Sequence, residues 1–132
     1  MIPEAAKPSM QGAAQSILAT CSPDGTPNIT SVSQVWYVDD HHVAVSFQFF
    51  SKTVQNLMAN PQASIRLFDP DGIHHWSIDA VYVRQETEGP LFDAMEMQLE
   101  AIASLTGMEG VFKLKGAHVY EVLRIERLRL VI

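Results

Sequence analysis

Two hydroxyl groups and one ammonium group follow each other at Ser51, Lys52 and Thr53. The five residues before them, SFQFF, have the alternation of a strand, and residues 52–60 have the spacing of a helix. The first N–H groups of a helix have no partners within it, and the helix dipole places partial positive charge there. Together with a lysine, such a strand-to-helix corner favours an anion. The three residues are therefore a candidate binding site for the phosphate group of a small molecule.

The same corner also has a purely structural explanation. The hydroxyl of Ser51 can serve as a helix N-cap by accepting a hydrogen bond from an amide two or three residues further on. Lys52 would then be an ordinary solvated surface residue. The corner alone leaves both interpretations open.

Composition indicates one compact domain that acts on neither nucleic acid nor a membrane. The chain has 132 residues, of which 47% are hydrophobic and 18% charged, which is typical of a single soluble core. Its net charge of −6 argues against nucleic acid, whose phosphates require clustered basic residues. No apolar run approaches the roughly 20 residues that cross a bilayer, and the first twelve residues lack the pattern of a secretory signal. We expect one cytoplasmic domain over 1–132, either a whole protein or the front part of a longer one.

The order of the predicted elements indicates a mainly β fold with flanking helices. Helices are inserted between strands rather than alternating with them, which excludes a doubly wound parallel sheet and favours a small antiparallel barrel. In the first helix, Val54, Leu57 and Met58 share one face. Strands are expected at 16–22, 28–38, 43–48, 63–68, 75–86 and 117–130, and helices at 52–60 and 90–105.

The remaining reactive side chains do not suggest a further site. The single Cys21 excludes an internal disulfide and a multi-cysteine metal site. The pairs His41-His42 and His74-His75 place adjacent side chains on opposite sides of a strand, so neither pair can chelate one ion. We interpret both pairs as hairpin surface and expect no metal. Late basic residues alternate with apolar ones, as on the wet face of a strand: Lys113, Lys115, Arg124, Arg127 and Arg129.

The chain resembles the FMN-binding split-barrel family that is named after pyridoxamine 5'-phosphate oxidase. The resemblance covers about residues 14–88, where the hairpin TCSPDGTPNITSVSQVWYVDDHHVAVSF precedes SKTVQNLMANPQASIRLF. Its most specific part is the arrangement of a strand, Ser-Lys-Thr, a helix, Asn-Pro and a further strand. The segment 87–128 is similar to a subgroup in which this domain precedes a sensory domain. The resemblance implies a six-stranded antiparallel split β-barrel that forms a homodimer, with one FMN in each of two clefts between the subunits.

The resemblance also assigns residues to the FMN site. Ser51, Lys52 and Thr53 match the family's phosphate-binding Ser-Arg-Lys stretch, with one cation instead of two. In the family oxidase the position of Ser31 is an arginine, so a further cation is missing here. Two strand segments match the walls around the flavin ring and ribityl chain: Ser31, Val32, Ser33 and Gln34 on one strand, and Ser46, Phe47 and Gln48 on the facing strand.

The hydroxyl groups of the first of these strands point to the same site independently. Ser31 and Ser33 share one face by the strand period of two. On a plain core face each hydroxyl would need a hydrogen-bond partner. The alternative is that this face is simply exposed to water.

The resemblance implies one of two classes of function. The first is an FMN-dependent oxidoreductase acting on a small substrate, in which the flavin carries the redox chemistry and no catalytic side chain can be named. The second is a non-catalytic flavin- or tetrapyrrole-binding module with a sensory or regulatory role. Pyridoxamine 5'-phosphate oxidase activity itself is not expected, because no histidine follows His118 to form the late Arg-x-His pattern that binds its substrate.

Overall fold

A computed structural model describes residues 1–11, 16–47, 51–105, 107 and 113–129, with only the backbone of Ser51. The 3-10 helix η1 (Glu4–Ser9) precedes the strands β1 (Ser16–Cys21), β2 (Pro27–Val32), β3 (Val35–Asp39) and β4 (His42–Phe47). Helix α1 (Ser51–Ala59) leads to β5 (Gln62–Phe68) and β6 (His74–Glu86), and helix α2 (Pro90–Leu105) leads to β7 (Gly116–Arg129). The helices and most strands begin and end within one or two residues of the predicted positions.

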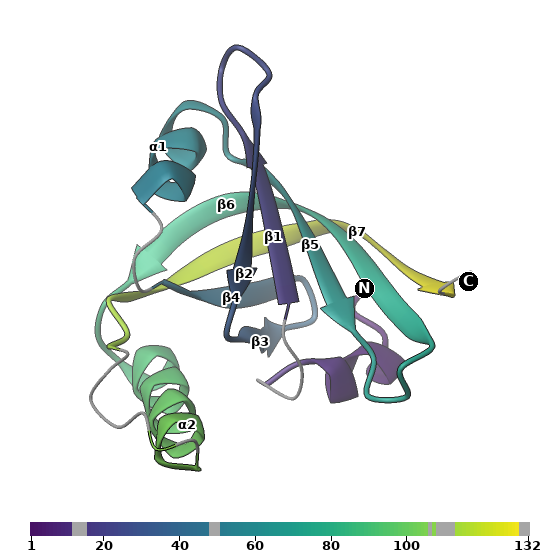
Figure 1. The fold of residues 1–132 in the computed structure, drawn as a ribbon, viewed down its shortest axis with the longest axis vertical. Coiled ribbons are helices and arrows are strands. Elements are labelled where there is room, and N and C mark those ends of the chain that lie inside the picture. The colour runs from purple at the N-terminus through teal and green to yellow at the C-terminus, as the bar shows by residue number, and fades with distance from the viewer. Residues whose placement is uncertain (12–15, 48–50, 106, 108–112, 130–132) are drawn as a thin grey trace.

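The seven strands form one antiparallel sheet in the order β2-β1-β5-β6-β7-β4-β3. Only Ser33 and Gln34 join its two edge strands, β2 and β3. The sheet must therefore curl until its edges come together, which makes a barrel that is open along the seam between them. Figure 1 shows the long strands β6 and β7 arching across the molecule above β3 and β4. The predicted antiparallel barrel with flanking helices is confirmed.

The prediction of one strand over 28–38 is wrong, because the chain divides it into β2 and β3 and the sheet has seven strands rather than six. Val32 and Val35 explain the division. Both side chains lie in the barrel core with 1% of their surface exposed, whereas residues three apart on a continuous strand point to opposite faces. Ser33 and Gln34, which lie between them, interrupt the alternation of inward and outward side chains. They lead the chain from β2 at one edge of the sheet to β3 at the other.

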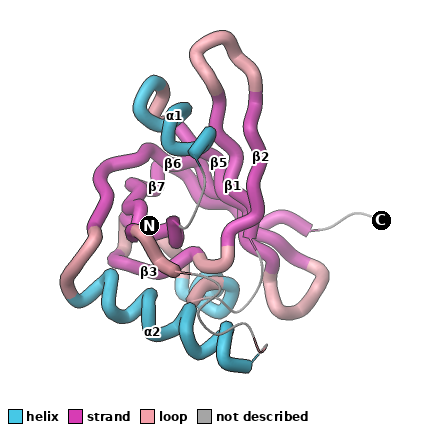
Figure 2. Tube along the Cα trace, turned by 60° about the vertical axis from the view of Figure 1, so that its left-hand side comes forward, coloured by secondary structure: helices cyan, strands magenta, loops and turns pink. Residues whose placement is uncertain are grey.

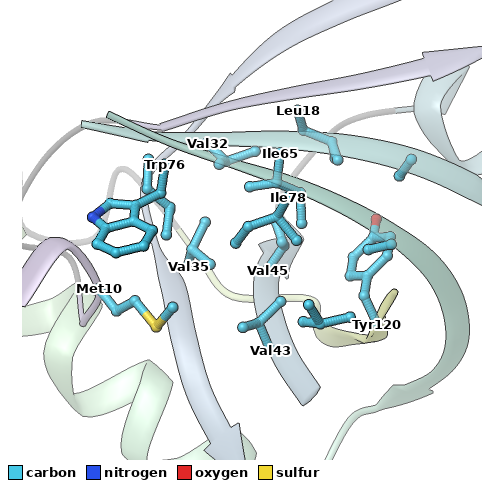
Figure 3. Close-up of a cluster of buried hydrophobic side chains, with 14 of the residues drawn as sticks. Met10, Leu18, Val32, Val35, Val43, Val45, Ile65, Trp76, Ile78 and Tyr120 are labelled. Carbon is cyan, nitrogen blue, oxygen red and sulfur yellow. The ribbon is translucent and has the colours of Figure 1, made fainter. Parts of the chain in front are cut away.

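Apolar side chains from all seven strands fill the barrel interior. Figure 3 shows Leu18, Ile65, Ile78 and Val45 converging at its centre. Met10, which follows η1, lies near Trp76 in the same view and belongs to the same cluster. Each such side chain contributes roughly 1.5–3 kcal/mol through burial, so this core fixes the barrel that carries the corner.

Helix α2 covers the outer face of the sheet at β3, β4 and β7. Met95 and Leu99 pack there against strand residues that include Ala44 and Val119, and Figure 2 shows the helix running past β3. Met95 and Leu99 are both buried. Gly107 follows the helix with a φ of +72°, a conformation that glycine adopts without strain.

Helix α1 turns a partly polar side toward the sheet. Thr53 and Asn56 are each 1% exposed and Leu57 is 3% exposed, whereas Met58 is 66% exposed. Of the three apolar residues predicted to share one face, Leu57 is therefore buried and Met58 exposed. Hydrogen bonds rather than apolar spacing set the orientation of this helix, because the side chain of Asn56 donates to Thr20 of β1 at 3.1 Å.

Candidate functional site

The first turn of α1 is fastened to the edge strand β2. The side-chain Nδ2 of Asn28 donates to Oγ1 of Thr53 at 3.0 Å. Together with the bond between Asn56 and Thr20, it ties α1 to both strands of the β1–β2 hairpin, beside which the helix lies in Figures 1 and 2. The first turn of α1 is therefore fixed beside the β1–β2 hairpin.

Lys52 is the exposed cation of this corner. Lys7, Arg84, Arg124 and Arg127 pair with carboxylates. Within the described residues Lys52 has no salt bridge, a property that it shares with Arg66, Lys113, Lys115 and Arg129. The first turn of α1 also contains no acidic residue. Within the described residues no carboxylate pairs with the ammonium group of Lys52, and the first N–H groups of a helix have no partners inside it, so both can bind an anion.

The three residues predicted to bind a phosphate have different environments in the structure. Lys52 is exposed, whereas the side chain of Thr53 is buried and its oxygen already accepts from Asn28. Helix α1 begins at Ser51, so this residue contributes a backbone N–H to the first turn; its side chain lies outside the described residues, as does all of Gln48. Thr53 therefore holds the first turn of α1 in place, and the exposed side chain of Lys52 can reach a ligand.

The predicted residues of β2 divide between two faces of the strand. Val32 points into the barrel core, and Ser31 is exposed and pairs with Ile17. Ser33 lies in the link after β2 and is also exposed. Asn28 and Ser31 are three residues apart on one strand, so their side chains point to opposite faces. A ligand that touches both Lys52 and Ser31 would therefore pass over the free edge of β2.

Gln34 and Ser46 lie under α2 rather than at the corner. Gln34 lies in the link between β2 and β3, and Ser46 lies in β4. The backbone N–H of Ser46 donates to the carbonyl of Gln34 at 3.4 Å. The side-chain Nε2 of Gln34 donates to the carbonyl of Met95 in α2 at 3.2 Å. Gln34 Oε1 and Ser46 Oγ are buried and have no hydrogen-bond partner among the described residues. The structure does not bring these two polar groups together with Lys52.

Phe47 ends β4 in a cluster of rings at the barrel end that leads to the corner. Its ring stacks on that of His118, with 4.6 Å between the centroids and 18° between the planes. The Nε2 of His118 lies 2.8 Å from Oε1 of Gln85, and the ring of Tyr82 meets the imidazole edge-on. Sequence patterns did not single out His118 or Gln85 for this cluster, because strand spacing gives no sign that these residues of β6 and β7 meet beside Phe47.

The described residues contain no cluster of three metal-binding side chains. His42 and His74 bond instead to the turn carboxylates of Asp39 and Asp71, at 2.8 and 2.7 Å. These contacts agree with the interpretation of both histidine pairs as hairpin surface.

A pocket of about 450 Å³ opens on the outer face of β1, β5 and β6. Asn60, Ser64, Asp79 and Leu123 contribute to its lining. Because Asn60 directly follows α1, the pocket lies at the opposite end of this helix from Lys52. No helix within the described ranges is long and apolar enough to cross a membrane.

Several solved structures share this fold. An FMN-binding protein from Syntrophomonas wolfei subsp. wolfei has a TM-score of 0.72 and 18% identity, over 89% of this chain and 78% of that one. An F420 reductase has a TM-score of 0.68 and 16% identity, over 95% of this chain and 98% of that one. HutZ, the heme storage protein from Vibrio cholerae, has a TM-score of 0.57 and 18% identity, over 87% of this chain and 85% of that one. Identities this low establish the fold alone.

No curated protein is similar enough to this chain to count as a match. The sequence profile of the pyridoxamine 5'-phosphate oxidase family, however, matches residues 2–131, which is almost the whole chain. The barrel with flanking helices agrees with that match. The chain therefore belongs to the pyridoxamine 5'-phosphate oxidase family and has the fold of its FMN-binding split barrels.

Proposed function

We propose that the chain binds FMN by its phosphate at the corner of Ser51, Lys52 and Thr53 and acts as an FMN-dependent oxidoreductase on a small substrate. The observation that carries the proposal is the state of Lys52, which is exposed and has no ion pair within the described residues. A dianionic phosphate suits this lysine and the free amides of α1. The fixed position of Thr53 supports the proposal, because a preformed corner loses little entropy on binding.

In this proposal the protein contributes binding and orientation. Bound FMN supplies the transfer of hydride or single electrons. Lys52 and the first-turn amides hold the phosphate end, and the unpaired backbone edge of β2 beside Ser31 offers N–H and C=O groups to the rest of the molecule. The substrate is one other than pyridoxamine 5'-phosphate, because the Arg-x-His pattern for that substrate is absent after His118.

The proposal includes a homodimer, in which a second copy completes each FMN cleft. The outer face of β2, β1, β5 and β6 is the side on which we place the contact. Ile29 is 70% exposed there, and Leu123 of β7, which helps to line the pocket on this face, is 51% exposed. Arg66 and Asp79 are exposed on the same face with opposite charges. A two-fold interface uses one patch twice, so a patch that combines apolar side chains with both charges suits it.

A titration with FMN and riboflavin tests the proposed binding. Only FMN carries a phosphate, and a charge-assisted contact of about 1.5–3 kcal/mol corresponds to roughly ten- to hundredfold in affinity. We expect FMN to bind tighter by that factor. Equal affinities contradict the phosphate corner, and no binding of either contradicts a flavin protein. Reduction of the bound flavin by NADH or NADPH, with turnover on an added acceptor, then tests the oxidoreductase.

The second candidate is a non-catalytic module that binds a flavin or a tetrapyrrole and reports on its supply. The fold shared with the heme storage protein HutZ favours it, and the Lys52 corner suits a propionate carboxylate as well as a phosphate. The two candidate functions differ in the absorption spectrum that the protein should show and in whether NADH or NADPH reduces a bound flavin. A Soret band after addition of heme, or a bound flavin that neither nicotinamide reduces, favours the module.

A further inference from the structure

We infer that Thr20 and Asn56 are positioning residues for the phosphate site, because the hydrogen bond between them sets the rotation of helix α1 about its own axis. The inference rests on the proposed function, in which Lys52 and the first N–H groups of this helix bind the phosphate of FMN. Neither residue was among those that the sequence assigned to the site.

The two strand residues that hold α1 lie directly opposite each other. Thr20 of β1 pairs with Asn28 of β2, and the side chains of such a cross-strand pair point to the same face of the sheet. The amide of Asn56 donates to Thr20 at 3.1 Å, and the amide of Asn28 donates to Thr53 at 3.0 Å. Both bonds thus join an asparagine amide to a threonine hydroxyl. One polar cluster therefore connects the hairpin to the helix through two parallel contacts.

Two bonds at neighbouring positions of the helix fix its rotation. Thr53 and Asn56 are three residues apart, so their side chains are neighbours on the helix surface. A single bond would act as a pivot, whereas two bonds to two strands leave the helix one orientation. Among the described residues, Leu57 is the one side chain that α1 contributes to the apolar core cluster. The polar cluster, more than apolar packing, therefore determines which side of α1 faces the sheet.

Asn56 bears most directly on Lys52. Lys52 precedes Asn56 by four positions, so the two side chains lie one turn apart on the same side of the helix. Asn56 is 1% exposed, whereas Lys52 is exposed. Lys52 therefore lies where the buried side of the helix meets the solvent, and a rotation of α1 would change the direction of its ammonium group.

Thr20 occupies a position where packing alone would favour an apolar residue. It follows Leu18 on the inward side of β1, and the two residues are 4% and 1% exposed. A buried hydroxyl costs free energy unless it is hydrogen-bonded, and Asn56 supplies that bond. A satisfied buried polar network makes a structure more rigid, which is the property that a preformed phosphate site requires.

The test compares FMN with riboflavin in the full chain and in four variants. Thr20→Val and Asn56→Ala each remove the bond between β1 and α1, and Thr20→Ser keeps the hydroxyl. Ser16→Ala is the matched control, because the hydroxyl of Ser16 is buried on the same side of the same strand but has no hydrogen-bond partner among the described residues. Thermal unfolding shows which variants are folded. If Thr20→Val is not, Asn56→Ala takes its place, since alanine has the highest helix propensity.

We expect Thr20→Val and Asn56→Ala each to bind FMN about three- to tenfold more weakly, the range that one lost hydrogen bond spans. Riboflavin has no phosphate for Lys52 to bind, so its affinity should stay within about twofold. Thr20→Ser and Ser16→Ala should leave both affinities within about twofold of wild type.

Folded Thr20→Val and Asn56→Ala proteins that keep wild-type FMN affinity, or that lose FMN and riboflavin affinity equally, overturn the inference and leave the proposed function standing. Wild-type protein that binds neither ligand, or both equally, overturns the proposed function and the inference with it.

Discussion

Asn28 of the edge strand β2 holds Thr53 of helix α1 by a side-chain hydrogen bond of 3.0 Å. The two residues are 25 positions apart, and their contact fixes the first turn of α1 to the edge strand β2. The buried Thr53 thus has a structural role, and the neighbouring Lys52 is left free to bind.

Lys52→Ala should weaken FMN binding roughly ten- to hundredfold, because one charge-assisted phosphate contact is worth about 1.5–3 kcal/mol. The midpoint of thermal unfolding should not change, since the side chain is exposed. Fluorescence titration measures the affinity. Lys7→Ala is the control: it removes the same charge from η1, which lies away from α1 in Figure 1. An unchanged affinity for Lys52→Ala would show that the lysine is an ordinary surface residue.

Asn28→Ala should lower the free energy of unfolding by about 1 kcal/mol, the usual value of one hydrogen bond, and should also weaken FMN binding. Its partner oxygen on Thr53 is then left buried without a donor. Urea unfolding and the FMN titration are measured on the same sample. Loss of stability with full FMN affinity would mean that the Asn28 contact does not hold the corner.

Gly25→Val should damage the β1–β2 hairpin and leave the corner alone. Gly25 has a φ of +89°, a conformation that costs a β-branched residue on the order of 1–3 kcal/mol. We expect a lower melting temperature and FMN affinity within about twofold of wild type. A variant as stable as wild type would show that the turn adopts another conformation in solution.

Protonation of His118 should destabilise the fold as the pH drops from about 6.5 to about 4. Burial lowers the pKa of His118 from 6.5 to about 4 in the folded chain, so the unfolded chain binds a proton in this range that the folded chain does not. Stability therefore falls with falling pH across this window. Urea unfolding at several pH values measures the slope. In His118→Phe the slope should be smaller, and an equal slope in both proteins would contradict the assignment.

Ile29→Glu should convert the proposed dimer into a monomer. The side chain is 70% exposed in the single chain, and a carboxylate at the centre of an interface would lose its hydration without gaining a partner. Light scattering on a sizing column measures the mass. Thr26→Glu, at an exposed position in the hairpin turn, is the control and should keep the wild-type mass. If the wild type itself has the mass of one chain, the dimer proposal is wrong.

Local patterns in the sequence predicted most of the fold. Helix α2 was predicted at its observed bounds, 90–105, because Pro90 opens it and apolar residues recur at helical spacing. Strands β5 and β6 were placed within one residue because turn residues flank them. The division between β2 and β3 was missed, because β-branched and aromatic residues continue through 28–38. The run is divided because the barrel closes there, and closure depends on strands that are distant in the sequence.

The site was only partly predictable for the same reason. Ser51, Lys52 and Thr53 are adjacent, so their corner could be inferred from strand and helix signals. The orientation of α1 could not, since it depends on the partners that Asn28 and Thr20 provide from another hairpin. His118 and Gln85 meet only through the register of β6 and β7, which contains two irregularities, and no local pattern predicts such a register.

The most direct test of the central claim is a crystal structure of the protein with FMN bound. We expect the phosphate to lie within hydrogen-bonding distance of Nζ of Lys52 and of the first backbone N–H groups of α1. A phosphate bound elsewhere, with Lys52 in open solvent, would contradict it.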